Sequence, residues 1–178
     1  GRADVPVSAR ASVVHPEWMD ITGPDGAVTH GADQDWFPDV WQQRAGCGPT
    51  AAALIFAYLA RSRPEWAPLY PEGRMDRTCF TAHMLRVWDY VTPKFHGLNR
   101  PEQMQEGMAA YAAARGVELH PALFAFPAAR TKRPPWEEVE DFVCRSLAAD
   151  CPEAFLNLHN GKVRELGWWH WVTITALE

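Results

Sequence analysis

The segment that decides the fold spans residues 46 to 61 and reads Gly46-Cys47-Gly48-Pro49-Thr50-Ala51-Ala52-Ala53-Leu54-Ile55-Phe56-Ala57-Tyr58-Leu59-Ala60-Arg61. Almost every side chain after the proline is apolar, which is typical of a helix buried on most of its faces. Proline suits the first turn, because its missing N–H would have had no partner there. We therefore expect a helix from Pro49 to about Arg61, ended by the following Pro64, with a cysteine directly before it.

Three later segments carry apolar residues at helical spacing. A second helix is expected from about Arg77 to Tyr90, and a third from Pro101 to Arg115, where Gly116 ends it. A fourth helix opens at residues 134–135, which are both proline. Between the third and fourth helices, the alternation at residues 117–120 predicts a short strand.

The hydrophobic period changes to two near the end of the sequence. Residues 154–158 are strand-like, Asn160-Gly161 signals a turn, and residues 168–177 are rich in aromatic and β-branched side chains. Helices first and strands last predict an α+β fold. We expect a single domain over residues 1–178, in which residues 1–35 form an extended N-terminal arm.

Composition indicates a folded globular protein, since 47% of the 178 residues are hydrophobic and 12% are aromatic. The net charge of -5 leaves no basic surface for nucleic acid, and no apolar run reaches the roughly 20 residues that a membrane span needs. The four cysteines contain no CxxC pair, so no structural zinc site is expected, and the predicted thiol chemistry needs no metal and no cofactor. We expect a monomer, and a secreted or cell-surface location is slightly favoured over a cytoplasmic one.

Cys47 is the candidate nucleophile. It lies between Gly46 and Gly48 and directly before the buried helix. The positive end of the helix dipole and the unpaired N–H groups of the first turn favour a thiolate over a thiol. The flanking glycines would let the backbone approach a ligand closely.

A thiol nucleophile needs a base, and His170 is the best of the seven histidines. It comes early in the last expected strand. Period-two alternation places it on one face with Val172 and Ile174, whereas Trp171 and Thr173 face the other way. We expect the apolar face to pack on the buried helix, with the imidazole near the N-terminus of that helix.

Acyl transfer also needs hydrogen-bond donors for the oxyanion of the tetrahedral intermediate. The backbone N–H of Cys47 is one candidate. A side-chain amide can come from Gln42 or Gln43, which both lie shortly before the cysteine.

These residues together resemble the papain-like cysteine peptidases. The two blocks are Trp41-Gln42 with Gly46-Cys47-Gly48-Pro49-Thr50, and the distant Trp169-His170-Trp171-Val172. They are most similar to the bacterial branch related to the bacteriocin-processing, double-glycine-leader peptidases. The resemblance implies Gln42 for the oxyanion hole, Cys47 as nucleophile and His170 as base. It also implies a helical N-terminal part, whose buried Cys-bearing helix packs on a C-terminal antiparallel sheet.

The family usually places an Asp or Asn on the strand after the histidine, where it orients the imidazole. Here the sequence ends at Glu178, so either that strand lies beyond residue 178 or another residue serves. Asn157 is the first candidate and Asn160 the second. Gly46, Gly48, Trp41 and Trp169 are the candidate substrate contacts.

The predicted function is cysteine-dependent hydrolysis of a peptide or a small amide. Two alternatives stay open. One is a papain-like binding module with a degraded catalytic site. It is favoured because the sequence shows no Asp- or Asn-bearing strand after His170. The other is a cysteine amidase or acyltransferase that acts on cell-wall peptides.

Overall fold

The computed structural model of the chain describes residues 11–95, 97–125, 130–157 and 170–177. Its helices are α1 (Val40–Ala45), α2 (Cys47–Ser62), α3 (Arg77–Trp88), α4 (Pro101–Ala114) and α5 (Trp136–Ala148). Its strands are β1 (Ala11–Ser12), β2 (Asp20–Thr22), β3 (Val28–His30), β4 (Glu153–Asn157), β5 (His170–Ile174) and β6 (Ala176–Leu177). Short 3-10 turns include η1 (Pro16–Met19), η2 (Gln34–Trp36), η3 (Pro64–Leu69) and η4 (Arg130–Lys132). The mixture of helices and small antiparallel sheets confirms the α+β class.

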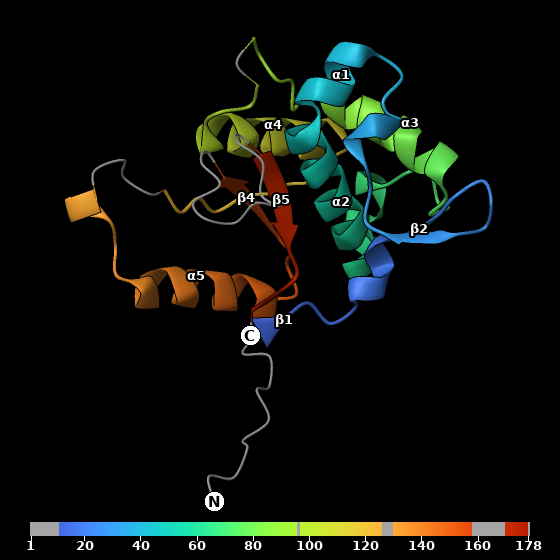
Figure 1. The fold of residues 1–178 in the computed structure, drawn as a ribbon. Coiled ribbons are helices and arrows are strands. Elements are labelled where there is room, and N and C mark those ends of the chain that lie inside the picture. Colours follow the sequence, from blue (N-terminus) through green and yellow to red (C-terminus); the bar gives the residue numbers. More distant parts are fainter. Residues whose placement is uncertain (1–10, 96, 126–129, 158–169, 178) are drawn as a thin grey trace, which may run out of the picture.

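Helix α2 forms the centre of the molecule. Every residue from Gly48 to Leu59 is buried, as its apolar sequence predicts. Figure 1 shows α2 between β5 on one side and α3 on the other, and both elements contact it. The helix begins two residues earlier than expected, because Gly46 rather than a residue nearer the proline is its N-cap. Cys47 is therefore part of the first turn.

Most of the other helix boundaries lie close to those expected from the sequence. Asp76 begins α3 by accepting a hydrogen bond from the N–H of Cys79 at 2.8 Å. Gly116 follows α4 with a φ of 74°, the left-handed conformation that glycine adopts without strain. Helix α1 was not predicted. It spans six residues and buries only Ala45, so it has no apolar stripe for a pattern to detect.

The six strands form three antiparallel pairs, β1–β6, β2–β3 and β4–β5. The β4–β5 pair runs in register from Glu153 opposite Ile174 to Asn157 opposite His170. The β1–β6 pair joins the start and the end of the described chain. The strands therefore bring His170 next to elements far away in sequence.

The N-terminal segment differs from the expected extended arm. Residues 11–35 contain β1 and the β2–β3 hairpin, and they bury Val13, Met19 and Ile21 in the core. Asp150 holds the segment in place, because it accepts hydrogen bonds from the N–H of Val14 at 2.8 Å and from the hydroxyl of Tyr58. Core packing thus continues well ahead of α2.

The strand expected at residues 117–120 is absent, and this part of the chain is irregular. Its side chains do alternate, with Val117 buried, Leu119 half-buried, and Glu118 and His120 exposed, but its backbone pairs with no strand among the described residues. The turn expected at residues 160–161 lies outside the described residues. In the described ranges, no helix has both the length and the apolar character that a membrane span requires.

Candidate functional site

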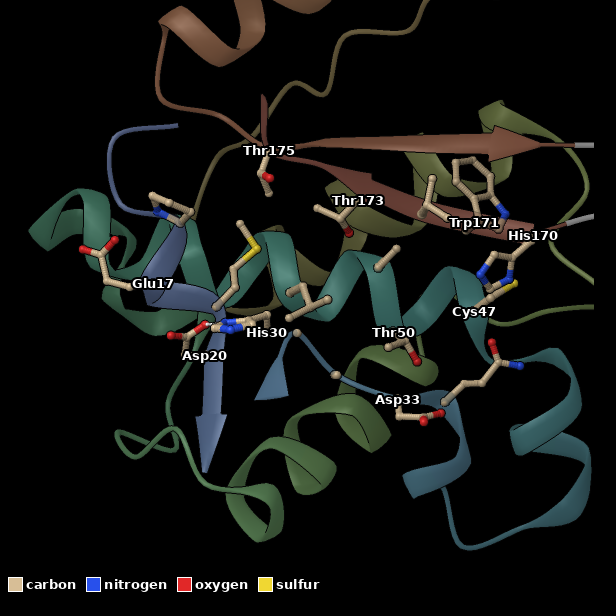
Figure 2. A pocket seen from close by; sticks show the side chains of 18 residues that line it. Glu17, Asp20, His30, Asp33, Cys47, Thr50, His170, Trp171, Thr173 and Thr175 are labelled. Carbon is tan, nitrogen blue, oxygen red and sulfur yellow. Dashed lines mark hydrogen bonds and ion pairs between the residues drawn. The ribbon is translucent and has the colours of Figure 1, made fainter. Parts of the chain in front are cut away.

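A groove of about 680 Å³ runs beside the N-terminal half of α2. Its floor belongs to α2 and consists of Cys47, Thr50, Ala51 and Leu54. One wall is β5 and the residue after it, with His170, Trp171, Val172, Thr173 and Thr175. The opposite wall is the segment His30, Gly31, Ala32, Asp33 and Gln34, and the far end is Pro16, Glu17, Met19 and Asp20. Figure 2 shows Thr173 and Thr175 on one side of α2, and His30 and Asp33 on the other.

Cys47 and His170 lie at the same end of this groove, where Figure 2 shows the imidazole beside the sulfur. Cys47 belongs to the first turn of α2 and His170 is the first residue of β5. The backbone N–H of Trp171, the next residue, donates to the sulfur of Cys47. His170 is therefore one residue away from a group that is hydrogen-bonded to the sulfur. The two residues paired by the sequence analysis are brought together.

Trp171 fixes the position of β5 against α2. Its side chain is buried, and its indole N–H donates to the carbonyl of Leu98 at 2.7 Å. The expectation that the Val172 face packs on α2 is wrong, because Trp171 contacts the first turn of α2 at Gly48. The imidazole of His170 nevertheless lies beside the sulfur, at the start of β5. Alternation identifies the two faces of a strand, but it does not indicate what approaches its edge.

The pKa of the Cys47 thiol is raised, which is opposite to the direction expected for a cysteine at a helix N-terminus. Burial is the dominant cause, because it disfavours the charged thiolate. Hydrogen bonds from the backbone N–H groups of Trp171, Gly48 and Cys47 itself act in the other direction but are outweighed. The resting side chain is therefore a thiol at neutral pH.

The two glycines beside Cys47 make room for protein side chains. A Cβ on Gly46 would lie 2.6 Å from Phe37 Cε2 and 2.3 Å from the carbonyl oxygen of Gln42. A Cβ on Gly48 would lie 2.7 Å from Leu98 Cδ2. Both glycines are buried, and neither lines the groove.

Among the described residues, the side-chain amide that lines the groove comes from Gln34. Its Nε2 donates to the backbone carbonyl of Gln43 at 2.6 Å, which leaves its second N–H for another acceptor. The amide of Gln43 donates to the carbonyl of Phe37 at 2.7 Å, and Gln42 lies on α1 outside the groove lining. Sequence reasoning missed Gln34, because its position depends on a contact with α1.

The remaining predicted residues have varied positions. Asn157 is directly opposite His170 in the β4–β5 ladder, so their Cα atoms are partners. Trp41 is 43% exposed on α1 and does not line the groove. Asn160 and Trp169 lie outside the described residues. The role of Asn157 as the orienter of the imidazole stays a prediction.

Polar side chains line the groove beyond the Cys–His end. Thr50 donates its hydroxyl to the carbonyl of Gly46 at 2.7 Å. The hydroxyl oxygen of Thr173 is buried, and none of the described residues hydrogen-bonds to it. The charged lining residues include Glu17, Asp20 and Asp33. Within the described ranges, His, Cys, Asp and Glu side chains form no cluster of three suited to a metal ion.

The fold and the site define an α+β chain with a cysteine and a histidine at one end of a groove. The chain matches no protein-family model, no curated protein and no solved structure.

Proposed function

We propose that the chain is a cysteine-dependent hydrolase that cleaves peptide or amide bonds, with a papain-like arrangement of its helix and sheet. The observation that carries this proposal is the juxtaposition of Cys47 and His170 at one end of a single groove. The buried Cys-bearing helix beside a His-bearing antiparallel strand supports the papain-like architecture. No cofactor takes part in the reaction.

The reaction is acyl transfer in two steps. The sulfur of Cys47 attacks the carbonyl carbon, the S–H proton passes to His170, and the carbonyl π electrons move to the oxygen. The intermediate then collapses, the C–N bond breaks, and the imidazolium gives its proton to the departing amine. Water, deprotonated by His170, attacks the thioester. The C–S bond breaks, the acid is released and the thiol is restored.

The raised pKa of Cys47 assigns a particular role to His170. Because the thiol is not ionised at rest, the imidazole must accept the proton while the C–S bond forms. The N–H of Trp171 hydrogen-bonds the sulfur and stabilises the negative charge that develops on it. His170 is therefore essential for attack as well as for release of the amine.

Donors for the oxyanion come from the first turn of α2 and from a side-chain amide. The backbone N–H of Cys47 is the first donor. Gln34 fits the second role better than Gln42, because its amide lines the groove and has an N–H beyond the one bound to Gln43. Replacing each glutamine with alanine in turn shows which of them is the second oxyanion donor. We expect Gln34→Ala to slow acylation about tenfold or more and Gln42→Ala to have little effect.

The alternative function is peptide binding in the same groove without catalysis. The raised pKa of the Cys47 thiol favours it, because a protonated sulfur is a weak nucleophile. Binding without turnover would leave the groove in use and would make Cys47 dispensable. The two functions therefore differ in their dependence on Cys47.

Turnover of p-nitrophenyl acetate at neutral pH tests the proposal. The wild-type protein should release several equivalents of nitrophenolate, with a transient acetyl group on Cys47 seen by intact-protein mass spectrometry. His170→Ala should lower the rate about 100-fold or more, the usual contribution of a general base. Cys47→Ser should show only background hydrolysis.

The half-exposed Cys144 provides a matched control, since it is a cysteine on the polar outer helix α5. Cys144→Ser should turn over like the wild-type protein. Equal rates for wild type, His170→Ala and Cys47→Ser would overturn the proposed hydrolase and leave the binding function.

A further inference from the structure

The outer edge of β5 forms one wall of the groove. In an antiparallel ladder the N–H and C=O of one residue point to the same side, and successive residues alternate. The N–H of Trp171 points away from β4, since it reaches the sulfur of Cys47. The backbone groups of Thr173 therefore point outward as well, into the groove that this residue lines.

Beyond the C-terminal end of β5, the same edge is already paired with a strand, β1. β1 pairs antiparallel with β6, and the N–H of Val13 donates to the outward carbonyl of Thr175 at 2.9 Å. After Val13 the chain turns away into η1. The groove is the continuation of that edge between Thr175 and Cys47.

This stretch of edge has hydrogen-bonding groups without a described partner. Within the described residues, no backbone hydrogen bond reaches Thr173 from the groove side, and its hydroxyl oxygen is buried and unpartnered. Buried polar groups in proteins are nearly always hydrogen-bonded. An extended segment lying on the floor made by Ala51 and Leu54 would satisfy the outward N–H and C=O of Thr173.

We propose that the groove binds an extended, basic peptide segment as an added antiparallel strand on β5, hydrogen-bonded to Thr173. The inference rests on the proposed function and names the part of the substrate that the site recognises. The segment continues the direction of β1, so its chain runs toward Cys47. The groove therefore holds the residues on the N-terminal side of the scissile bond.

Charge indicates which peptides fit. Among the described residues, the groove lining includes Glu17, Asp20 and Asp33 and no lysine or arginine. Asp20 and Glu17 are each hydrogen-bonded to a histidine, His30 at 2.6 Å and His15 at 2.9 Å. Both carboxylates lie at the end of the groove away from Cys47. A lysine or arginine several residues before the scissile bond is favoured there, and an acidic residue is disfavoured.

The register makes a sharp prediction. If the residue before the scissile bond lies level with Trp171, the third residue before that bond lies opposite Thr173. Directly opposite residues of this kind exchange both backbone hydrogen bonds. The second residue points its N–H away from β5. Methylation of the backbone nitrogen should therefore matter at the third residue and not at the second.

Peptide aldehydes provide the probe, because they add reversibly to a thiol as the S–H adds across the C=O bond. The readout is protection of Cys47 from iodoacetamide, followed by mass spectrometry. A four-residue aldehyde with an N-terminal lysine should protect at least tenfold better than acetyl-glycinal. N-methylation at its third residue from the aldehyde should remove most of this gain. The expected loss of protection is roughly tenfold, which corresponds to one hydrogen bond. N-methylation at its second residue should change protection less than twofold.

On the protein, Thr173→Pro removes the outward N–H without removing a β4–β5 hydrogen bond, as proline does on an edge strand. It should abolish the gain from chain length, so that the four-residue aldehyde protects Cys47 no better than acetyl-glycinal does. Thr173→Val is the matched control, because it keeps the backbone donor. A lysine-to-glutamate change in the peptide should weaken protection.

The outcomes separate this inference from the proposed function. If acetyl-glycinal protects Cys47 but longer aldehydes gain nothing, or if N-methylation acts equally at both residues, the strand-binding inference fails and the hydrolase stands. If longer aldehydes bind with the expected pattern while ester turnover is absent, the hydrolase fails and the groove assignment stands.

Discussion

The indole of Trp171 contacts the helix turn that holds Cys47 at the position of Gly48, where an added Cβ would lie 3.3 Å from the Cδ1 atom of the tryptophan. The same Cβ would lie 2.7 Å from Leu98 Cδ2, and Leu98 accepts the indole hydrogen bond through its carbonyl. Gly48, Trp171 and Leu98 therefore form one packed unit. It sets the distance between β5 and α2, and with it the distance between His170 and Cys47.

Gly48→Ala should disturb this unit. The added methyl group forces Leu98 and Trp171 to shift, which should lower the free energy of unfolding by about 1–3 kcal/mol and slow ester turnover. Urea unfolding and p-nitrophenyl acetate turnover measure the two effects. In the double variant Gly48→Ala with Leu98→Ala, the clash is relieved, so the two losses should not add. Additive losses would show that Leu98 is not the group that the methyl meets.

The pH dependence of Cys47 alkylation should reflect its burial. Because the pKa of the thiol is raised above its ordinary value of 9.0, the rate with iodoacetamide should keep rising as the pH passes 9. The measurement uses a variant in which Cys79, Cys144 and Cys151 are serine. A rate that levels off below pH 8 would instead indicate that the thiolate is already formed at rest, as the position of Cys47 before the helix led us to expect.

The sequence predicted α2 and its cysteine because one local property, an apolar run after Gly46-Cys47-Gly48-Pro49, determines the burial of the helix and gives its start to within two residues. His170 was found in the same way, from a strand rich in aromatic and β-branched residues. The direction of the Cys47 pKa was wrong, because a local dipole argument omits the desolvation produced by elements distant in sequence.

Other parts of the site could not be predicted for a related reason. Gln34 reaches the groove through a hydrogen bond to Gln43, and Thr173 matters because no described strand pairs with its outer edge. Both facts depend on tertiary neighbours. Alternation along β5 distinguishes its faces, whereas the groove is formed at its edge. A sequence pattern carries no signal for that edge.

His83 should make the fold sensitive to acid. It is fully buried on α3, and its Nε2 lies 2.9 Å from the carbonyl of Ala53 in α2. Burial lowers its pKa from 6.5 to about 4, so the folded protein keeps the ring neutral. The contribution of the neutral ring to the free energy of unfolding is fully present above about pH 6.5. It is lost as the pH falls toward 4, and the total loss is about 3 kcal/mol.

His83→Phe tests this sign. The phenyl ring fits among the neighbouring aromatic rings but cannot be protonated. At pH 7 the free energy of unfolding of the variant should be about 1 kcal/mol lower than that of the wild type, the usual cost of one hydrogen bond. It should then resist acid better than the wild type, as measured by urea unfolding at pH 7 and pH 4.5. Parallel losses in both proteins would show that His83 does not cause the acid sensitivity.

Glu153 should act with the opposite sign. Burial raises its pKa from 4.5 to about 7, and its Oε2 is buried without a hydrogen-bond partner among the described residues. The folded state therefore favours the protonated carboxyl, and stability is lost as the pH rises from about 4.5 to about 7. Glu153→Gln should be about 1–3 kcal/mol more stable than wild type at pH 8 and similar to it near pH 4.5. The exposed Glu137→Gln is the control, and an equal gain there would contradict the assignment to burial.

Asn157 provides the last test, because it faces His170 directly across the β4–β5 ladder. The ladder makes their Cα atoms direct partners, so Asn157 is the candidate on β4 for orienting the imidazole. If Asn157 orients the ring, Asn157→Ala should lower ester turnover about 10- to 100-fold while leaving the free energy of unfolding nearly unchanged. Asn157→Asp should restore much of the activity, since a carboxylate also accepts the ring N–H. It should also move the acid limb of the pH–rate profile upward, because it stabilises the imidazolium whereas His170 must be neutral to act as the base. A purely structural asparagine would not produce that shift. Phe155→Ala changes the same face of the same strand two residues away, so an equal loss of turnover there would mean that the ladder, and not the amide, supports His170.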